Sequence, residues 1–384
     1  MKKICMITTI STTLKSFVVD TAKYLYEQCG YEVTLICNTD EEFSKGLPSY
    51  VHYIPVTMNR GINISGFKAI THLKKIFKRE KFDLVQYATP NASVYASIAA
   101  KICKVPIRLY CQWGIRYVGF QGLKRRIFKA LEKLVCAKST HIFAVSPLNM
   151  KFAIKEGLYI SSKAQVVGNG GTIGVDTEKY NIERKEEWRR EIRAKYGVEE
   201  KNFVFGFVGR VSVDKGCGEL LWAFKNLSKK HKEIKLFVIG PMEESCGVNK
   251  ELFNWAKQSP NVVLVGNVKE EDMCKYYASI NILVHPTYRE GFGMVIQEAG
   301  ALAVPTITTD VPGASEVMEK DRSCVIVPVK NASELSEAME QMLFNPQKVE
   351  RLGQVAYKRT KELYERKIML ANQKEVYQKL LGEK

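Results

Sequence analysis

The feature that most constrains this chain is an alternation of short β-type apolar runs with longer helical stretches, which occurs in both halves of the sequence. Such alternation is typical of parallel sheets whose strands are joined by crossover helices. In the first half we expect strands at Lys3–Ile10, Val33–Cys37, Val51–Val56, Asp83–Tyr87, Ile107–Cys111, His141–Val145 and Ala164–Val167. In the second half we expect them at Phe203–Val208, Lys235–Ile239, Val262–Val265, Ile282–Val284, Pro305–Thr308 and Cys324–Val327. Helices are expected between them, as at Val18–Gln28, Gly66–Arg79, Ser93–Lys101 and Leu123–Lys138. The pattern predicts an α/β protein.

With 384 residues the chain is long enough for two domains with separate cores. The many glycines of Val167–Asp176 predict a turning backbone at the end of the first domain. The charged segment Glu183–Lys201 predicts a linker followed by one amphipathic helix, so we place the boundary near residue 182. The last helical stretch, Leu343–Leu381, is broken by Pro346.

The net charge of +17 is concentrated in the first half of the chain. Residues 1–180 contain 26 lysines and arginines against 12 aspartates and glutamates, a net charge of +14. Such a surface suggests an anionic partner, namely a membrane surface, a nucleic acid or a phosphorylated substrate. Basic amphipathic helices are predicted at Gly66–Arg79 and Gly122–Lys138, and the second carries Lys124, Arg125, Arg126 and Lys129. Their charges form either a solvated face or a contact with anionic lipid, and both interpretations stay open.

Cysteine usage and missing motifs exclude several classes of protein. The ten cysteines show no Cys-x-x-Cys and no zinc spacing, so we expect buried free thiols in a reducing cytoplasm, with Cys5, Cys37, Cys111 and Cys324 in strand-like runs. There is no Asp-x-Asp, and we expect no metal site. The run Ser11–Phe17, which we interpret as a polar loop, lacks Gly-x-Gly-x-x-Gly and so argues against a nicotinamide or flavin dehydrogenase. No apolar run approaches the roughly 20 residues that span a bilayer, and the N-terminus predicts a first strand rather than a signal peptide.

The stretch Arg289–Ala299 gives the first functional prediction. It follows an apolar strand and a proline-containing loop, and it places Gly291 and Gly293 on either side of one aromatic residue. Glycines let the backbone approach a ligand closely, and amides at the following helix N-terminus offer donors to an anion or to sugar hydroxyls. Glu290 stands in the loop, whereas Glu298 lies in the second helical turn among apolar neighbours. A buried carboxylate needs hydrogen-bonding partners, and ligand hydroxyls would serve.

A second motif, Val208–Gly216, follows the first strand of the second half. Arg210 can fork to phosphate oxygens and Lys215 can supply a point charge, in a loop position where α/β proteins bind ligands. In this order and about 80 residues apart, the two motifs resemble the Gly-Arg…Lys-Gly and Glu-x7-Glu motifs of glycosyltransferase family 4, retaining enzymes of the GT-B fold. The resemblance covers nearly the whole chain, and the run Thr13–Phe17 resembles the branch that builds bacterial capsule and cell-surface polysaccharides.

The resemblance implies a GT-B fold, with two Rossmann-like domains facing across a cleft and a C-terminal helix that crosses back to the first domain. It implies an acceptor-binding domain at residues 1–182, a nucleotide-sugar-binding domain at 183–365 and the crossing helix at 366–384. In the first domain it places the acceptor near Thr13, Lys15, Ser16, Trp113, Gly114, Arg116 and Asn169. Trp113 stands where many members of the family have a histidine, so the role of that histidine is not carried over.

For the second domain the resemblance implies a donor site. Its residues are Gly209, Arg210, Lys215, Glu290, Gly291, Phe292, Gly293 and Glu298, with Arg210, Lys215 and Glu290 as the catalytic ones. By resemblance, Glu290 and the turn amides hold the hydroxyls of the donor sugar, and Glu298 accepts hydrogen bonds from the nucleotide ribose. Cationic side chains and aimed amides then stabilise the diphosphate, without a metal ion or a cofactor.

We therefore expect a retaining hexosyl- or N-acetylhexosaminyltransferase with a nucleotide-diphosphate donor, for which a UDP-sugar and a UDP-N-acetylhexosamine are candidates. The basic first domain favours a polyprenyl-diphosphate-linked saccharide as acceptor, at the inner face of the cytoplasmic membrane, in capsule or surface polysaccharide synthesis. A soluble acceptor stays open as the nearest alternative. A GT-B sugar-nucleotide epimerase is disfavoured by the pair of motifs. A nucleic-acid-binding protein, which would need a recognisable binding module, leaves both glutamates unexplained.

Overall fold

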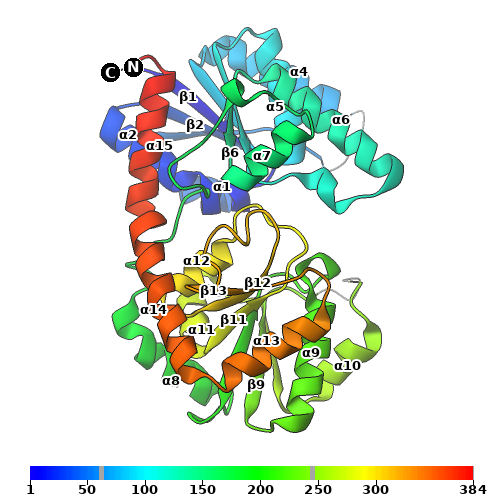
Figure 1. The fold of residues 1–384 in the computed structure, drawn as a ribbon. Coiled ribbons are helices and arrows are strands. Elements are labelled where there is room, and N and C mark those ends of the chain that lie inside the picture. Colours follow the sequence, from blue (N-terminus) through cyan, green and yellow to red (C-terminus); the bar gives the residue numbers. More distant parts are fainter. Residues whose placement is uncertain (60–64, 243–246, 384) are drawn as a thin grey trace. The chain divides into compact units, whose positions relative to one another are not determined.

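The computed structural model describes residues 1–59, 65–242 and 247–383 of the chain, and it divides into two compact units (Figure 1). The first unit contains Met1–Ile173 and Lys367–Lys384, and the second contains Gly174–Arg366. Each unit is built around a parallel sheet of its own. The predicted α/β class with two Rossmann-like units is therefore confirmed.

The sheet of the first unit has seven strands in the order β3-β2-β1-β4-β5-β6-β7. They are β1 (Lys3–Ile7), β2 (Glu32–Cys37), β3 (Val51–Pro55), β4 (Leu84–Tyr87), β5 (Ile107–Gln112), β6 (His141–Ala144) and β7 (Ala164–Val166). All seven were predicted, but β1 ends at Ile7 and the prediction of a polar loop at Ser11–Phe17 is wrong. These residues form the helix α1, because Leu14 is fully buried and no glycine or proline interrupts the run.

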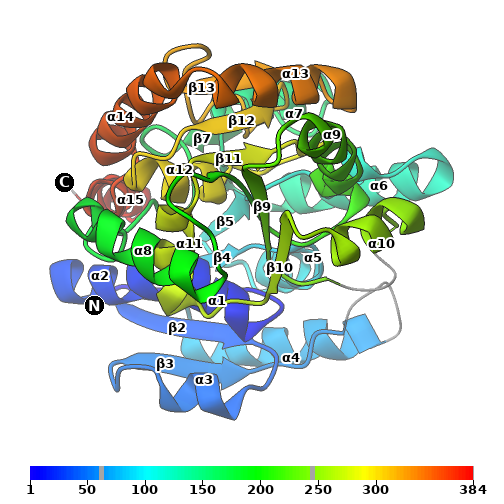
Figure 2. The same ribbon diagram turned by 90° about the horizontal axis from the view of Figure 1, so that it is seen from below.

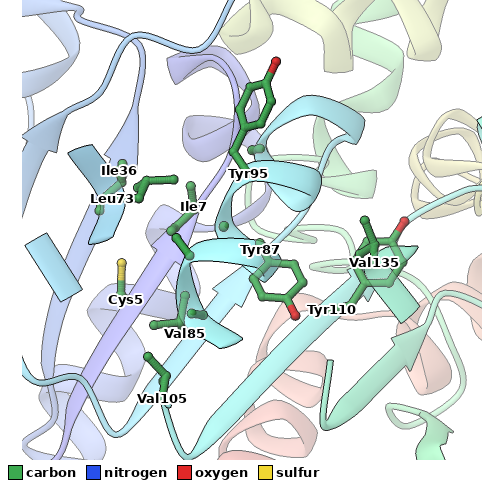
Figure 3. Packing of buried hydrophobic residues seen from close by; sticks show 14 of the residues in the cluster. Cys5, Ile7, Ile36, Leu73, Val85, Tyr87, Tyr95, Val105, Tyr110 and Val135 are labelled. Carbon is green, nitrogen blue, oxygen red and sulfur yellow. The ribbon is translucent and has the colours of Figure 1, made fainter. Parts of the chain in front are cut away.

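Helices cover both faces of this sheet. They are α1 (Ser11–Phe17), α2 (Val19–Cys29), α3 (Glu41–Lys45), α4 (Ser65–Glu80), α5 (Pro90–Ile102), η1 (Arg116–Gly119), α6 (Gly122–Lys138), α7 (Pro147–Lys155), η2 (Ser161–Lys163) and α15 (Arg366–Leu380). Cys5 and Ile7 of β1 pack under α4 and α5 (Figure 3), whereas Ile4 and Met6 pack against α1, α2 and α15. Alternate residues of β1 thus enter opposite cores, as the two-residue period of a strand requires.

The last helix, α15, packs on the first unit, which confirms the predicted return of the C-terminal helix (Figure 1). The Gln373 side chain accepts a hydrogen bond from the Thr21 hydroxyl at 2.7 Å and donates one to the Thr172 carbonyl at 2.6 Å. Tyr377 is buried in the same core, where its hydroxyl contacts Gln86. These contacts join the two ends of the chain in one unit.

The passage from the first unit to the second lies at Ile173–Gly174, earlier than the boundary that we expected near residue 182. The Val175 N–H donates to the Tyr364 carbonyl, and the Arg366 N–H donates to the Val175 carbonyl, both at 2.8 Å. This pairing ties the residues after Gly174 to the second unit. It also separates α14 from α15 at Tyr364–Glu365, an interruption that the sequence did not reveal, whereas Pro346 opens α14.

The sheet of the second unit has six strands in the order β10-β9-β8-β11-β12-β13. They are β8 (Phe203–Val208), β9 (Ile234–Ile239), β10 (Val262–Gly266), β11 (Ile282–His285), β12 (Thr306–Thr309) and β13 (Cys324–Val327), all predicted from apolar runs. The helices are η3 (Ile182–Arg184), α8 (Lys185–Lys195), η4 (Val213–Lys215), α9 (Cys217–Lys230), α10 (Lys250–Gln258), η5 (Glu270–Asp272), α11 (Met273–Ser279), α12 (Met294–Ala301), α13 (Ala332–Leu343) and α14 (Pro346–Leu363). One core lies between the sheet and α9, α10 and α13, while α8, α11 and α12 lie on the other side (Figure 2).

Two further expectations concern the whole chain. In the described residues no helix is both long enough and apolar enough to cross a membrane. The four strand cysteines, Cys5, Cys37, Cys111 and Cys324, are buried as predicted, and every cysteine that the structure describes is free. Cys246 lies outside the described residues.

Candidate active site

The two motifs of the second unit lie in loops that follow the neighbouring strands β8 and β11. The Tyr288 N–H donates to the Asp214 carbonyl at 2.9 Å, and the Thr287 hydroxyl donates to the same oxygen at 3.3 Å. Gly216 adopts a φ of +70°, and a Cβ there would lie 2.0 Å from the Pro286 carbonyl oxygen. Only glycine therefore allows the first loop to lie against the second, which brings Lys215 beside Glu290.

Two side chains and one backbone N–H group contact the carboxylate of Glu290. Its Oε2 lies 2.7 Å from Lys215 Nζ and 2.9 Å from His285 Nε2, and its Oε1 accepts a 3.0 Å bond from the Gly291 N–H. Burial opposes ionisation of Glu290, but the bonds from His285 and the charge of Lys215 outweigh it and hold the pKa of that carboxyl well below its usual range. The site therefore contains a fixed carboxylate paired with an ammonium group.

A second cluster of charges surrounds Asp214. Its Oδ2 lies 2.9 Å from Arg289 Nη2 and 3.7 Å from Arg210 Nη2, while its Oδ1 accepts a 2.6 Å bond from the Ser212 hydroxyl. Burial raises the pKa of Asp214, but the Ser212 bond and the two guanidinium groups outweigh this effect and lower it. Arg210 remains about half exposed, so its guanidinium keeps donors for an anion.

The turn Gly291–Gly293 after Glu290 is hydrogen-bonded to, and packs closely against, the loop after β12. The Gly293 N–H donates to the Gly313 carbonyl at 2.8 Å, and a Cβ on Gly313 would lie 2.1 Å from the Gly291 carbonyl oxygen. The N–H groups of Gly291 and Gly293 thus donate within the protein. The Phe292 ring is 5% exposed and packs edge-on against Tyr364, so its side chain belongs to the core.

Glu298 lies in α12 and takes part in a separate hydrogen-bond network. The Tyr277 hydroxyl donates to Glu298 Oε2 at 2.6 Å, and the ring of Tyr180 packs beside Tyr277. Burial raises the pKa of Glu298, and hydrogen bonds from Tyr277 and Tyr180 only partly oppose this. The predicted apolar surroundings of Glu298 are present, and two tyrosine hydroxyls serve as its partners.

The predicted acceptor residues are distributed over several elements of the first unit. On α1, Thr13 is half-buried, while Lys15 and Ser16 are exposed. After β5, Trp113 packs against Phe17 of α1, with ring centres 5.4 Å apart, at the edge of a cavity of about 30 Å³ that also touches α15. Gly114 follows Trp113 in the same loop, and Asn169 is exposed in the loop after β7. The structure therefore brings Trp113 and α1 together.

Arg116 points elsewhere, toward the aromatic residues that precede and line α6. Its guanidinium carbon lies 5.0 Å from the centre of the Phe128 ring and 5.9 Å from that of Phe120. Such cation–π contacts fix η1 against α6. They give Arg116 a structural explanation that the sequence did not suggest.

The four predicted membrane-surface residues of α6 divide into two pairs. Lys129 Nζ lies 2.6 Å and Arg125 Nη2 lies 3.6 Å from Oε2 of Glu156, the residue after α7, so both are held by a carboxylate. Lys124 and Arg126 are exposed, and Lys124 Nζ lies 4.3 Å above the Phe120 ring. Lys124 and Arg126 are therefore the members of the set whose charge faces solvent.

Sequence reasoning missed three residues of the site, namely His285, Asp214 and Arg289. The signal for Asp214 was its place directly before Lys215 inside a motif already singled out. The signal for His285 was a polar residue at the end of an apolar strand, five positions before Glu290. Neither position shows from the sequence alone which side chain it contacts. The Asp214 contact with Arg289 joins two loops, and the His285 contact with Glu290 depends on how the chain turns after β11.

Comparison with known proteins identifies the family. The model described as Glycosyl transferase 4-like matches residues 3–146, and the model described as Glycosyl transferases group 1 matches residues 189–359. The capsular polysaccharide biosynthesis glycosyltransferase CapM of Staphylococcus aureus is 31% identical over 354 residues, which cover 92% of this chain and 91% of CapM. The chain belongs to the group 1 glycosyltransferases. The family 4 resemblance drawn from the two motifs is confirmed.

This glycosyltransferase is also similar to a second enzyme in sequence and to a solved structure in fold. The Escherichia coli UDP-Gal:alpha-D-GlcNAc-diphosphoundecaprenol alpha-1,3-galactosyltransferase is 23% identical over 332 residues, covering 80% of this chain and 79% of that enzyme. The crystal structure of Anabaena Alr3699/HepE in complex with UDP superposes with a TM-score of 0.80 at 18% identity, over 99% of this chain and 100% of HepE. The structural match shows the GT-B fold. The glycosyltransferase is thus related to enzymes of capsular polysaccharide synthesis and of transfer to a lipid-linked acceptor.

Proposed function

We propose that this glycosyltransferase moves a sugar, with retention of its anomeric configuration, from a UDP-sugar to a polyprenyl-diphosphate-linked saccharide of a capsule or surface polysaccharide. The observation that carries the proposal is the pairing of Lys215 with Glu290, beside Arg210, at the carboxyl ends of β8 and β11. Ligands of open α/β sheets bind at these strand ends. A cation for a diphosphate and a carboxylate for sugar hydroxyls stand there side by side.

The donor would lie with its diphosphate toward Lys215 and Arg210. As the bond between the sugar carbon and the diphosphate oxygen breaks, negative charge grows on the leaving diphosphate, and both cations stabilise it. Glu290 Oε1 would accept hydrogen bonds from the sugar hydroxyls, and Glu298 from the nucleotide ribose. The UDP complex of HepE and the UDP-galactose named for the E. coli enzyme support a uridine nucleotide.

Retention follows if the acceptor attacks from the face that the diphosphate leaves. The acceptor oxygen forms the new bond to the sugar carbon, the bond to the diphosphate breaks, and the hydroxyl proton passes to a diphosphate oxygen. No protein nucleophile is required by this scheme, and no metal or cofactor is part of the proposal. Among the described residues no group of three or more His, Cys, Asp or Glu side chains is arranged to hold a metal ion.

The donor sugar is proposed to be a hexose or an N-acetylhexosamine, with UDP-N-acetylhexosamines as the first donors to test. For the acceptor, the basic first unit is the supporting feature. Its helices α4, α5 and α6 lie side by side over one face of the sheet (Figure 1) and carry exposed apolar residues beside the charges. Phe67 at the start of α4 and Leu123 at the start of α6 are both 72% exposed.

This combination of charge and exposed apolar surface fits an anionic membrane. Each Lys or Arg near such a surface contributes about 1 kcal/mol, and a buried aromatic or leucine side chain adds to it. Lys124 follows Leu123 directly, and Arg126 directly precedes Ile127, which is 42% exposed. We therefore propose a peripheral protein at the inner face of the cytoplasmic membrane, where a polyprenyl-linked acceptor would be present.

The proposal is tested by a donor screen scored through release of UDP, with a membrane fraction of the source cell as acceptor and a lipid-extracted fraction as control. Release that requires both one UDP-sugar and the intact lipid fraction would support it. Equal release with a soluble saccharide acceptor would instead favour the soluble-acceptor alternative.

A further inference from the structure

His285 occupies a position at the site that neither motif explains. It ends β11, is 1% exposed, and holds the same Glu290 oxygen that Lys215 holds. The backbone at His285 is held in place, because the Thr308 hydroxyl donates to the His285 carbonyl at 3.0 Å and a proline follows directly. Lys215, by contrast, reaches Glu290 through a long flexible side chain from another loop.

The surroundings of the ring decide which nitrogen carries the proton. Nε2 must be protonated if it is to donate to the ionised Glu290. Nδ1 is buried and, within the part of the chain that the structure describes, has no hydrogen-bond partner, so a proton there would be unsatisfied. Burial and the nearby Lys215 charge lower the pKa of His285, although the bond to Glu290 opposes them. The geometry favours a neutral ring with its proton on Nε2.

Lys215 faces two competing anions if the proposed function holds. In this structure its ammonium pairs with Glu290, but a donor diphosphate carries more negative charge and would draw it away. Glu290 would then lose one of the two side-chain donors on Oε2 at the moment when its orientation toward the sugar matters. The remaining donor is His285.

We propose that His285 is a positioning residue that keeps the Glu290 carboxylate oriented while Lys215 exchanges Glu290 for the diphosphate of the donor. This inference rests on the proposed function and adds a residue and a step to it. A neutral donor suits the task, since it fixes the carboxylate without adding a second cation that would hold the diphosphate away from Lys215. His285 itself touches neither the donor nor the acceptor.

Two substitutions separate the hydrogen bond from the space that the ring fills. His285→Gln keeps an N–H donor at the same number of bonds from the backbone, whereas His285→Leu removes it. Thr306→Val is the matched control, a buried position on the adjacent strand β12 that is not among the hydrogen-bond partners of Glu290 in the described residues. We expect His285→Leu to lower kcat about tenfold or more, since a bond to a charged group is lost, and His285→Gln to restore most of it. Affinity for free UDP, which lacks the sugar, should stay within about twofold in both.

A spectroscopic measurement reports directly on the His285 ring of the wild-type protein. Nitrogen-15 NMR of the wild-type protein distinguishes the two tautomers and the protonated ring, and the chain has only five histidines, so difference against His285→Gln assigns the signal. We expect a neutral ring protonated on Nε2 at pH 7. A proton on Nδ1 alone, or a doubly protonated ring, would overturn the inference.

The kinetic outcomes are equally decisive. Wild-type kcat in His285→Leu would overturn the inference, and so would a loss in His285→Gln as deep as that in His285→Leu. A parallel loss of UDP affinity in both variants, with Thr306→Val unaffected, would show a purely structural role. Failure of the proposed function looks different, because the wild-type protein would then transfer no sugar from any UDP donor, and the inference would fall with it.

Discussion

Removing the ammonium group of Lys215 should affect turnover and stability by different amounts. At 2.7 Å, and with an effective dielectric constant of about 20, the attraction between Lys215 and Glu290 is roughly 6 kcal/mol. Much of it is offset by desolvation, because the two side chains are only 21% and 18% exposed. Lys215→Ala leaves Glu290 with His285 as a side-chain donor, so we expect a net destabilisation of about 1–3 kcal/mol.

The same change should lower kcat by about 10²-fold or more, the scale of losing one preformed charge stabiliser at a developing anion. The double variant Lys215→Ala/Glu290→Gln separates the two effects. Removing the uncompensated carboxylate should restore part of the stability, whereas turnover should stay low because the cation is still missing. Denaturant unfolding measures the first quantity and UDP release under saturating donor measures the second.

The ion pair between Lys215 and Glu290 also predicts how the free energy of unfolding depends on pH. Since the folded-state pKa of Glu290 lies below its usual value, the stabilisation is present above the unfolded-state pKa of about 4.3 and is lost as the pH falls toward the folded-state value. The difference in unfolding free energy between wild type and Lys215→Ala should therefore shrink below about pH 4. Near-normal turnover of both Lys215→Ala and Arg210→Ala would refute the assignment of these residues to the diphosphate.

Four further predictions concern other residues and conditions. Glu298→Gln should weaken UDP binding in calorimetry, while its stability at pH 7 stays equal or rises, because burial raises the pKa of this carboxyl and so disfavours its ionised form in the folded protein. Glu290→Gln should leave UDP binding largely intact and lose transfer, since its partner is the sugar. Activity should persist in a metal chelator, because Lys215 and Arg210 supply the positive charge. Lys124→Glu/Arg126→Glu should reduce binding to anionic vesicles at low salt, by about 2 kcal/mol or more when two charges are reversed.

Each of these predictions has a result that would contradict it. Equal effects of the two glutamine variants on UDP binding would mean that the division between ribose and sugar is wrong. Loss of activity in chelator that magnesium or manganese restores would refute metal independence. For the vesicle experiment, Lys229→Glu/Lys361→Glu on the second unit is the matched control, since both lysines are exposed. Unchanged binding by the α6 variant would mean that its charge is a solvated surface.

The sheets could be predicted because their strands read as short apolar runs, and central strands such as β1, β4 and β11 are buried on both faces. All thirteen strands of the described residues were anticipated, with ends that differ by up to three residues. The helix α1 was missed because its seven residues carry few apolar side chains, and its stability comes from burying Leu14 in the tertiary structure. The interruption before α15 was missed for a similar reason, since it arises from pairing with Val175, far away in the sequence.

At the site, the sequence indicated which residues lie near one another, but it did not show which side chains form direct contacts. Lys215 and Glu290 were both singled out, yet their direct ion pair depends on Gly216 lying against Pro286. Phe292 was expected to meet the donor, but its side chain packs on Tyr364, which comes from the end of α14. Such contacts follow from packing between elements distant in the chain, which local patterns do not encode.

The proposed activity is retaining transfer from a UDP-sugar to a lipid-linked saccharide. The most direct measurement incubates the protein with each UDP-sugar and a polyprenyl-diphosphate-linked acceptor, and determines the anomeric configuration of the new linkage by NMR. We expect UDP release that depends on the acceptor and a linkage with the same configuration as the donor. An inverted linkage, or consumption of the UDP-sugar without any glycosylated lipid, would contradict it.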